Sequence, residues 1–390
     1  MIHGFLKACT VSPALRVADC AFNTQQTIAA MQRAAADGVQ LAVFPELGLT
    51  GYTCGDLFFQ QPLQRAAAKG LAAVLEASAD LDLVALVGLP VTVDGKLYNC
   101  AAVVCHGKLL GLVPKTYLPN YGEFYERRQF NPAPAGVRTL HFAGQEVPFG
   151  TQLLFRCAEM PEFCLGVEVC EDLWAPLPPS THHALAGATV IANLSASDET
   201  IGKAEYRRAL VTGQSARLLC GYVYADAGEG ESTTDMVFAG HNMVAENGAL
   251  LAETAPFCGG MALTDIDVER LAGERLKNTS FPAEDNANYE VIPFVLPQNV
   301  SPLTRIVSSA PFVPADAEQR ARRCDAILAM QASGLKKRLE HTHAKTAVVG
   351  ISGGLDSCLA LLVTVRAFSL LERPLSDIVA VTMPCFGTTE

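Results

Sequence analysis

The sequence has a deficit of positive charge. Its 390 residues include 29 Lys and Arg against 40 Asp and Glu, which gives a formal net charge of -11. Proteins that bind nucleic acids in general usually carry a basic face, so this balance disfavours that class of function.

Long apolar runs are also missing. The longest, such as residues 83–93, are too short to span a bilayer. Residues 3–9 lack the long apolar core of a signal peptide, and the chain soon becomes polar. We therefore expect no membrane association and a cytoplasmic location.

Several metal and nucleotide motifs are absent. The 13 cysteines include no C-x-x-C pair, which removes the signature of thioredoxins and zinc ribbons. No H-E-x-x-H occurs, and no Gly-Lys-Ser or Gly-Lys-Thr follows a glycine-rich loop as in a Walker A motif. A disulfide framework is not expected in a chain of this size without a secretion signal.

The chain is long enough for two domains, each with a full core. Helix-like segments at 24–36, 62–78 and 204–219 alternate with short apolar, strand-like runs. These runs occupy residues 41–44, 83–89, 101–105, 109–113, 164–169, 189–192 and 222–225. Turns at 106–108 and 246–248 predict two hairpins. We predict a layered α/β domain over residues 1–270.

From about residue 271 prolines interrupt every long element, so we predict a linker over 271–314. The pattern then predicts a helix over 315–340, a strand over 346–351, a helix over 355–371 and a strand over 378–383. Continuous apolar strands in this order indicate a buried parallel sheet of a doubly wound, Rossmann-like domain. Two strands cannot close such a core, so we expect residues 315–390 to form an incomplete domain.

Three reactive side chains each follow a strand-like run: Glu46, Lys115 and Cys170. If the strands are neighbours, these side chains meet at one edge of a sheet. A carboxylate can take the proton of a thiol, and an ammonium stabilises charge on sulfur and on an oxyanion. Singly, they also fit a solvated turn, an exposed lysine and a packing cysteine. Together they suit hydrolysis of an amide through a thioester.

The residues around these positions resemble a known family. Residues 44–52, 114–119 and 168–174 are similar to motifs of the carbon–nitrogen hydrolase (nitrilase-like) superfamily. With residues 51–57 and 193–197, they look like the glutaminase domain of the glutamine-dependent NAD synthetase family. The resemblance covers about the first two-thirds of the chain, with the motifs in the family's order.

This resemblance implies an αββα sandwich in which Glu46 is the general base, Lys115 the electrophilic stabiliser and Cys170 the nucleophile. It also implies a set of glutamine contacts, namely Tyr52, Tyr121, Glu171, Ser197 and Lys203. Glu123 and Glu126 are candidates for a second carboxylate beside the lysine, and a charged loop explains them equally well.

The loop Ser352-Gly353-Gly354-Leu355-Asp356-Ser357 lies between a predicted strand and a predicted helix. Glycines let backbone approach phosphate closely, and a helix N-terminus offers free N–H groups. Ser352 and Ser357 add hydroxyl donors, and Asp356 is a candidate ligand for Mg²⁺. A Gly-Gly turn is often only a tight connection. This one resembles the pyrophosphate-binding loop of ATP pyrophosphatases, which adenylate a substrate with ATP.

Together, the two resemblances imply a C–N bond-forming ligase that uses ammonia from glutamine to amidate ATP-adenylated deamido-NAD. They imply ATP and Mg²⁺, no prosthetic group, no nucleic acid and a homo-oligomer. Three alternatives stay open: a stand-alone amidase or nitrilase, a nucleotide-binding scaffold without turnover, and a tRNA-thiolating enzyme. The acidic charge disfavours the last.

Overall fold

The computed structural model describes residues 4–297 and 302–383, and it divides into two units, Met1–Arg305 and Ile306–Glu390. The division falls within residues 271–314. Part of that range belongs to the first unit, because it holds the end of helix α6 (Val268–Lys277) and strand β15 (Glu290–Phe294).

One mixed sheet of the first unit has eight strands within the described residues. They are β1 (Phe5–Ser12), β2 (Leu41–Val43), β3 (Val84–Val93), β4 (Lys96–Cys105), β5 (Lys108–Pro114), β6 (Arg138–Phe142), β7 (Gln145–Phe149) and β14 (Gly260–Asp267). Their spatial order is β14-β1-β2-β3-β4-β5-β7-β6. The expected hairpin at 106–108 is confirmed, since it joins β4 to β5.

A second mixed sheet has seven strands in the described part of the chain. It contains β15 together with β8 (Leu153–Cys157), β9 (Cys164–Val169), β10 (Val190–Ser195), β11 (Gly221–Asp226), β12 (Met243–Glu246) and β13 (Ala249–Glu253). The order is β13-β12-β11-β10-β9-β8-β15. The expected hairpin at 246–248 is confirmed between β12 and β13.

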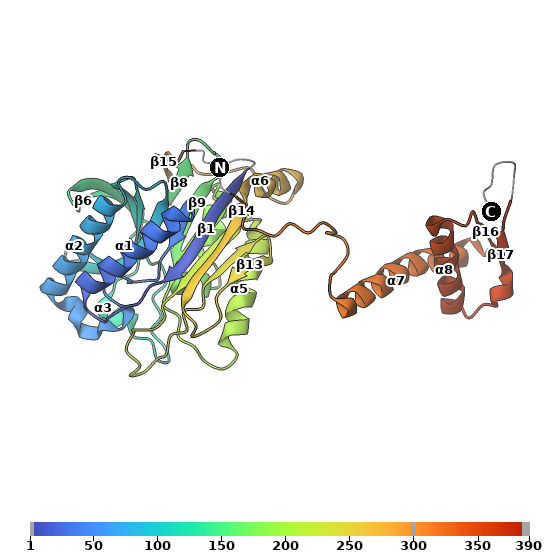
Figure 1. Ribbon diagram of the computed structural model, residues 1–390, viewed down its shortest axis with the longest axis horizontal. Helices are drawn as coiled ribbons and strands as arrows, with labels where there is room; N and C mark the ends of the chain where they lie inside the picture. The colour runs from blue at the N-terminus through green and yellow to red at the C-terminus, as the bar shows by residue number, and fades with distance from the viewer. Residues whose placement is uncertain (1–3, 298–301, 384–390) are drawn as a thin grey trace. The chain divides into compact units, whose positions relative to one another are not determined.

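The two sheets pack face to face and each is covered by helices on its outer face (Figure 1). Inward side chains of both sheets, such as Leu86 and Val167, share one core cluster. The next residue of β3, Val87, belongs instead to the cluster beneath the helices. Because β3 is buried on both faces, its sequence is almost continuously apolar.

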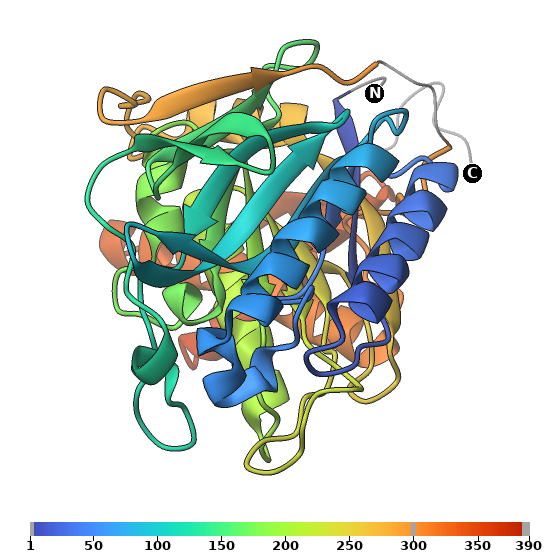
Figure 2. The ribbon, with the colours of Figure 1, turned by 90° about the vertical axis from the view of Figure 1, so that its left-hand side faces the viewer.

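Helices α1 (Cys20–Ala36) and α2 (Gln61–Ala77) cover the first sheet, where Figure 2 shows them side by side. Helices α4 (Pro179–Leu185) and α5 (Lys203–Leu218) cover the second sheet. The short helices η1 (Tyr52–Phe59), α3 (Glu126–Gln129) and η2 (Cys170–Leu173) follow strand ends or loops. The expected αββα sandwich is therefore confirmed. None of the helices in the described ranges has the length and apolar character that a membrane crossing needs.

The second unit has a strand–helix–strand arrangement. Its described elements are α7 (Ala317–Thr342), β16 (Ala347–Gly350), α8 (Leu355–Leu370), η3 (Leu375–Asp377) and β17 (Ile378–Val381). The two strands pair in parallel, as expected. The expectation of a buried sheet is wrong for the described part of this unit, since Val348 is 68% exposed. The buried residues of its small core lie on α7 and α8, and Ala347 of β16 and Ile378 of β17 are only partly buried against them. Residues 384–390 of the predicted domain lie outside the described residues.

Candidate active site

Cys170 lies at a strained turn between β9 and η2. Its φ of +46° is in the left-handed region, which a residue with a side chain seldom adopts. Such a conformation costs about 1–3 kcal/mol and persists where the surroundings fix it. Here the N–H of Cys170 donates to Asn193 Oδ1 at 3.1 Å, and the side chain is buried.

Asp172 ties this turn to the end of β5. Its Oδ1 accepts from the N–H of Thr116 at 3.1 Å and from the N–H of Tyr117 at 2.8 Å. Its Oδ2 accepts from the N–H of Val169 at 2.9 Å. One buried carboxylate thus joins the segment that follows Lys115 to the segment that carries Cys170.

We predict that Asp172→Ala lowers the free energy of unfolding by about 3 kcal/mol, because three N–H groups lose their acceptor in a buried setting. Urea denaturation followed through Trp174, the single tryptophan of the chain, measures this beside the substituted position. The matched control is Glu76→Ala, an exposed carboxylate on α2, which should change stability by less than about 0.5 kcal/mol. If the two substitutions lowered the free energy of unfolding equally, the proposed structural role of Asp172 would be wrong.

Glu46 follows β2 on a loop that crosses close over β3. A Cβ atom at Gly88 of β3 would lie 2.3 Å from the backbone nitrogen of Leu47 and 2.6 Å from the carbonyl oxygen of Pro45. Only glycine allows this approach. The loop also reaches the second sheet, since Glu46 Oε2 accepts from the N–H of Ala196 at 2.9 Å.

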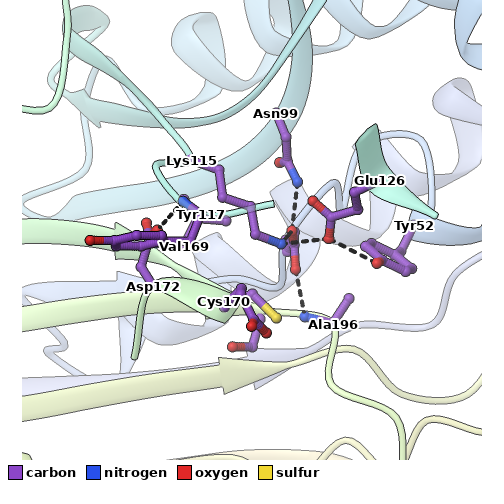
Figure 3. A network of polar contacts seen from close by, with 12 residues as sticks. Tyr52, Asn99, Lys115, Tyr117, Glu126, Val169, Cys170, Asp172 and Ala196 are labelled. Atoms are coloured by element: carbon purple, nitrogen blue, oxygen red, sulfur yellow. Dashed lines mark hydrogen bonds and ion pairs between the residues drawn. The ribbon is translucent and has the colours of Figure 1, made fainter. Parts of the chain in front are cut away.

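Lys115 lies between two carboxylates, as Figure 3 shows. Its Nζ is 2.6 Å from Glu46 Oε1 and 2.5 Å from Glu126 Oε1, and all three side chains are at most 4% exposed. Asn99 Nδ2 donates to Glu46 Oε1 at 2.5 Å, and the Tyr52 hydroxyl donates to Glu126 Oε1 at 2.8 Å. The ammonium is thus held by two carboxylates, and each carboxylate is itself fixed by a hydrogen bond from another side chain.

Burial and charge act in opposite directions on this network. Burial lowers the pKa of Lys115, but Glu126 and Glu46 outweigh it and raise that pKa well above its usual range. Burial raises the pKa of Glu126 to about 7, an effect that Lys115 opposes and Glu46 increases. Lys115 is therefore charged at neutral pH.

The thiol of Cys170 lies beside this network (Figure 3). Burial raises the pKa of Cys170 well above its usual range, Glu46 adds to the effect, and the Lys115 ammonium opposes it. The thiol is therefore neutral at rest. To act as a nucleophile it must give its proton to a base at the moment of attack.

A cavity of about 430 Å³ opens next to Cys170. Its lining includes four of the glutamine contacts that the family resemblance implies: Tyr121, Glu171, Ser197 and Lys203. The Tyr121 hydroxyl donates to Glu171 Oε1 at 2.8 Å. Lys203 pairs with Asp198, with its Nζ 5.5 Å from each of the ring centroids of Phe124 and Trp174. The cavity thus offers the carboxylates of Glu171 and Glu123 and the ammonium of Lys203 to a bound molecule.

Two other predicted site residues, Tyr52 and Glu126, lie outside the lining of this cavity. Tyr52 is absent from the lining of this cavity, and its hydroxyl is bonded to Glu126. Of the two acidic candidates beside the lysine, Glu126 contacts Lys115, while Glu123 lines the cavity. Sequence reasoning gave no role to Asn99, and assigned Asp172 only to a motif.

The loop 352–357 of the second unit joins β16 to α8. Gly353 has a φ of +82°, which favours glycine. Ser357 Oγ accepts from the N–H of Ser352 at 3.3 Å and donates to the carbonyl of Gly354 at 3.0 Å. The predicted loop residues Ser352, Gly353, Gly354, Asp356 and Ser357 are thus brought together at the start of α8, exposed or partly exposed. Among the described residues, no group of three or more His, Cys, Asp or Glu could hold a metal ion.

An αββα sandwich that gathers a carboxylate, an ammonium and a thiol at one sheet edge defines a class of cysteine-dependent hydrolases with a nitrilase-like fold. Residues 8–275 match the carbon-nitrogen hydrolase family, and the chain belongs to this family. Residues 327–390 match a second family, NAD synthase.

Curated relatives and solved structures agree with this assignment. The glutamine-dependent NAD(+) synthetase of Mycobacterium tuberculosis is 44% identical over 100% of this chain and 59% of its own length. The chain therefore spans about three-fifths of such relatives. The structure of a glutamine-dependent NAD(+) synthetase from Cytophaga hutchinsonii has a TM-score of 0.61, at 23% identity over 96% of this chain and 54% of that one. An amidase from Nesterenkonia sp. has a TM-score of 0.54, at 20% identity over 71% of this chain and 97% of the amidase. These two structures share the fold of the chain described here.

Proposed function

We propose that this chain hydrolyses the side-chain amide of glutamine at Cys170, as the glutaminase part of a glutamine-dependent NAD synthetase. The observation that carries this proposal is the cavity beside Cys170, which offers a carboxylate from Glu171 and an ammonium from Lys203. Such a pair complements the ammonium and carboxylate of an amino acid. The 44% identity to a synthetase of that name supports the choice of glutamine.

In the proposed mechanism, Glu46 takes the thiol proton as Cys170 Sγ attacks the amide carbon. The carbonyl oxygen becomes an oxyanion, which the Lys115 ammonium stabilises. The backbone N–H of Cys170 already donates to Asn193 Oδ1, so it is not free to donate to the oxyanion. Lys115 is therefore the donor that we assign to the oxyanion. Glu46 returns the proton to the amide nitrogen, the C–N bond breaks, and ammonia leaves.

A glutamyl thioester remains on Cys170 after this step. Glu46 then deprotonates a water molecule, which attacks the thioester carbon, and the C–S bond breaks. The sulfur takes the proton back and glutamate leaves. We place Glu126 beside Lys115 as the second carboxylate of the site, where it keeps the ammonium charged and oriented.

For the second unit we propose binding of ATP phosphates at Ser352–Ser357, as part of a domain that adenylates deamido-NAD for attack by the ammonia. Asp356 is the carboxylate that the loop offers to Mg²⁺, and Mg²⁺ usually takes one or two protein carboxylates together with substrate phosphates. The residues present therefore fit a metal carried by ATP. The similar structure of a glutamine-dependent NAD+ synthetase from Acinetobacter baumannii is a complex with adenosine diphosphate, which supports nucleotide binding. We also propose that the protein is a homo-oligomer and that it is located in the cytoplasm.

The deciding experiment compares ammonia release from glutamine, butyramide and butyronitrile. We predict that kcat/KM for glutamine exceeds that for the other two by at least about a hundredfold, because only glutamine can pair with both Glu171 and Lys203. A preference for butyramide or butyronitrile would instead favour a stand-alone amidase or nitrilase.

A further inference from the structure

Arg207 is a buried cation behind the cavity rather than in its lining. It lies on α5 with no exposed surface. Its Nη1 donates to Glu199 Oε2 and to His241 Nδ1, both at 2.9 Å. Its Nη2 donates to Ser197 Oγ at 3.2 Å and to the carbonyl of Asp198 at 3.0 Å. Of these contacts, Ser197 is the one that lines the cavity beside Cys170.

The guanidinium determines what the Ser197 hydroxyl can do. Because a guanidinium has donors and no acceptor, Ser197 Oγ must accept from Arg207. The hydroxyl hydrogen of Ser197 then points away from Arg207, and no hydrogen bond found among the described residues uses it. The N–H of Ser197 donates to Asp226 Oδ1 at 2.8 Å, which fixes the backbone. Accepting from Arg207 uses one of the two lone pairs of Ser197 Oγ, and the hydroxyl hydrogen is left to be donated to a molecule in the cavity.

His241 keeps the guanidinium in this orientation. Since Arg207 can only donate, His241 Nδ1 is the acceptor, so a neutral ring carries its proton on Nε2. The Nε2–H group of His241 then donates a hydrogen bond to Glu253 Oε1, at an N···O distance of 2.5 Å. Each contact in the series Glu253, His241, Arg207, Ser197 thus has a donor facing an acceptor.

The cavity is consequently polarised. Glu171, on the side of Tyr121, offers an acceptor for a cation. Ser197 and Lys203 offer donors for an anion. An α-amino acid carries one group of each kind, while a simple amide carries neither.

We propose that Arg207 is a positioning residue that makes the cavity selective for a substrate with an α-carboxylate, by holding Ser197 as a hydrogen-bond donor. This inference rests on the proposed glutaminase function. It assigns the carboxylate end of glutamine to Ser197 and the ammonium end to Glu171.

The test uses three primary amides: glutamine, glutaramate, which lacks the α-ammonium, and 4-aminobutanamide, which lacks the α-carboxylate. We expect Arg207→Lys to raise KM for glutamine and glutaramate by about tenfold, because a charge-assisted hydrogen bond to the carboxylate is weakened. We expect kcat to stay within about threefold, and kcat/KM for 4-aminobutanamide to be unchanged. Arg217→Lys, on the exposed side of the same helix, is the matched control and should alter none of these constants.

A loss of the same size on all three amides would overturn the inference, because a merely structural role of Arg207 predicts it. Ser197→Ala should give the same selective rise, and adding Arg207→Lys to it should cause no further rise. Additive effects would overturn the inference. Should Arg207→Lys not fold, an equal loss on the three amides in Ser197→Ala would overturn it as well. Failure of the unsubstituted chain on glutamine would refute the proposed function itself, which is a different result from a working chain with an unselective variant.

Discussion

Cys170→Ala should lower kcat/KM for glutamine hydrolysis by at least about 10⁴-fold, because no other group of the site can form the thioester. The change removes one sulfur atom and keeps the Cβ atom, so the conformational cost of the turn at Cys170 stays the same. We therefore expect the variant to fold. The measurement is ammonia release over a range of glutamine concentrations, which gives kcat/KM, with circular dichroism as the check on folding.

A covalent label gives an independent measurement of the same role. A glutamine-derived electrophile, such as a diazoketone analogue, should add to Cys170 and block turnover, and mass spectrometry locates the adduct. Cys258→Ala is the matched control, since Cys258 is exposed and should leave both turnover and labelling unchanged. Turnover without an adduct on Cys170 would contradict the thioester mechanism, and an inert, unlabelled chain would favour a scaffold without catalysis.

Local pattern was sufficient to predict the central strands and the reactive residues that follow them. β3 and β9 are buried on both faces, so their apolar runs are nearly unbroken and end where polar residues begin. The same alternation of strand and helix predicted the layers. The convergence of Glu46 and Lys115 at one edge followed from their position after strands, and the structure brings them to 2.6 Å.

Pairings between distant segments could not be predicted in this way. β1 pairs with β14, although about 250 residues separate them. No short turn joins these two strands, so the local sequence gives no sign that they pair. β15 contains Pro293, which is tolerated because the strand lies at the edge of its sheet. The half-exposed strands of the β6–β7 hairpin lack the continuous apolar run that marks the inner strands.

Part of the site was missed for the same reason. Asn99 lies within β4, and nothing in its neighbours shows that its amide reaches Glu46 across the sheet. Arg207 looks like an ordinary charged residue of a surface helix, because its partners come from two other parts of the chain, residues 197–199 and His241. A motif shows which side chains react, whereas the residues that orient them are defined only by tertiary packing.

Lys115→Met should reduce kcat/KM for glutamine by at least about a thousandfold, and it should destabilise the fold by about 3 kcal/mol. Two effects combine. The oxyanion loses its cationic donor, and the carboxylates of Glu46 and Glu126 are left buried without the charge that separates them. Like charges at close range raise the pKa of one partner, so the pair should hold one proton near neutral pH. A shared proton leaves Glu46 a poorer base.

The double variant Lys115→Met/Glu126→Gln separates these two effects. It removes the excess negative charge, so most of the lost stability should return, while activity should stay low because the oxyanion donor is still missing. The residual activity of the single variant should rise with pH, since the shared proton is released only at higher pH, and that rise should be absent from the double variant. Lys108→Met, at the exposed start of β5, the strand that precedes Lys115, is the matched control and should keep full activity. Recovery of turnover together with stability in the double variant would show that Lys115 only neutralises charge, and the oxyanion role would then have to be assigned to another group.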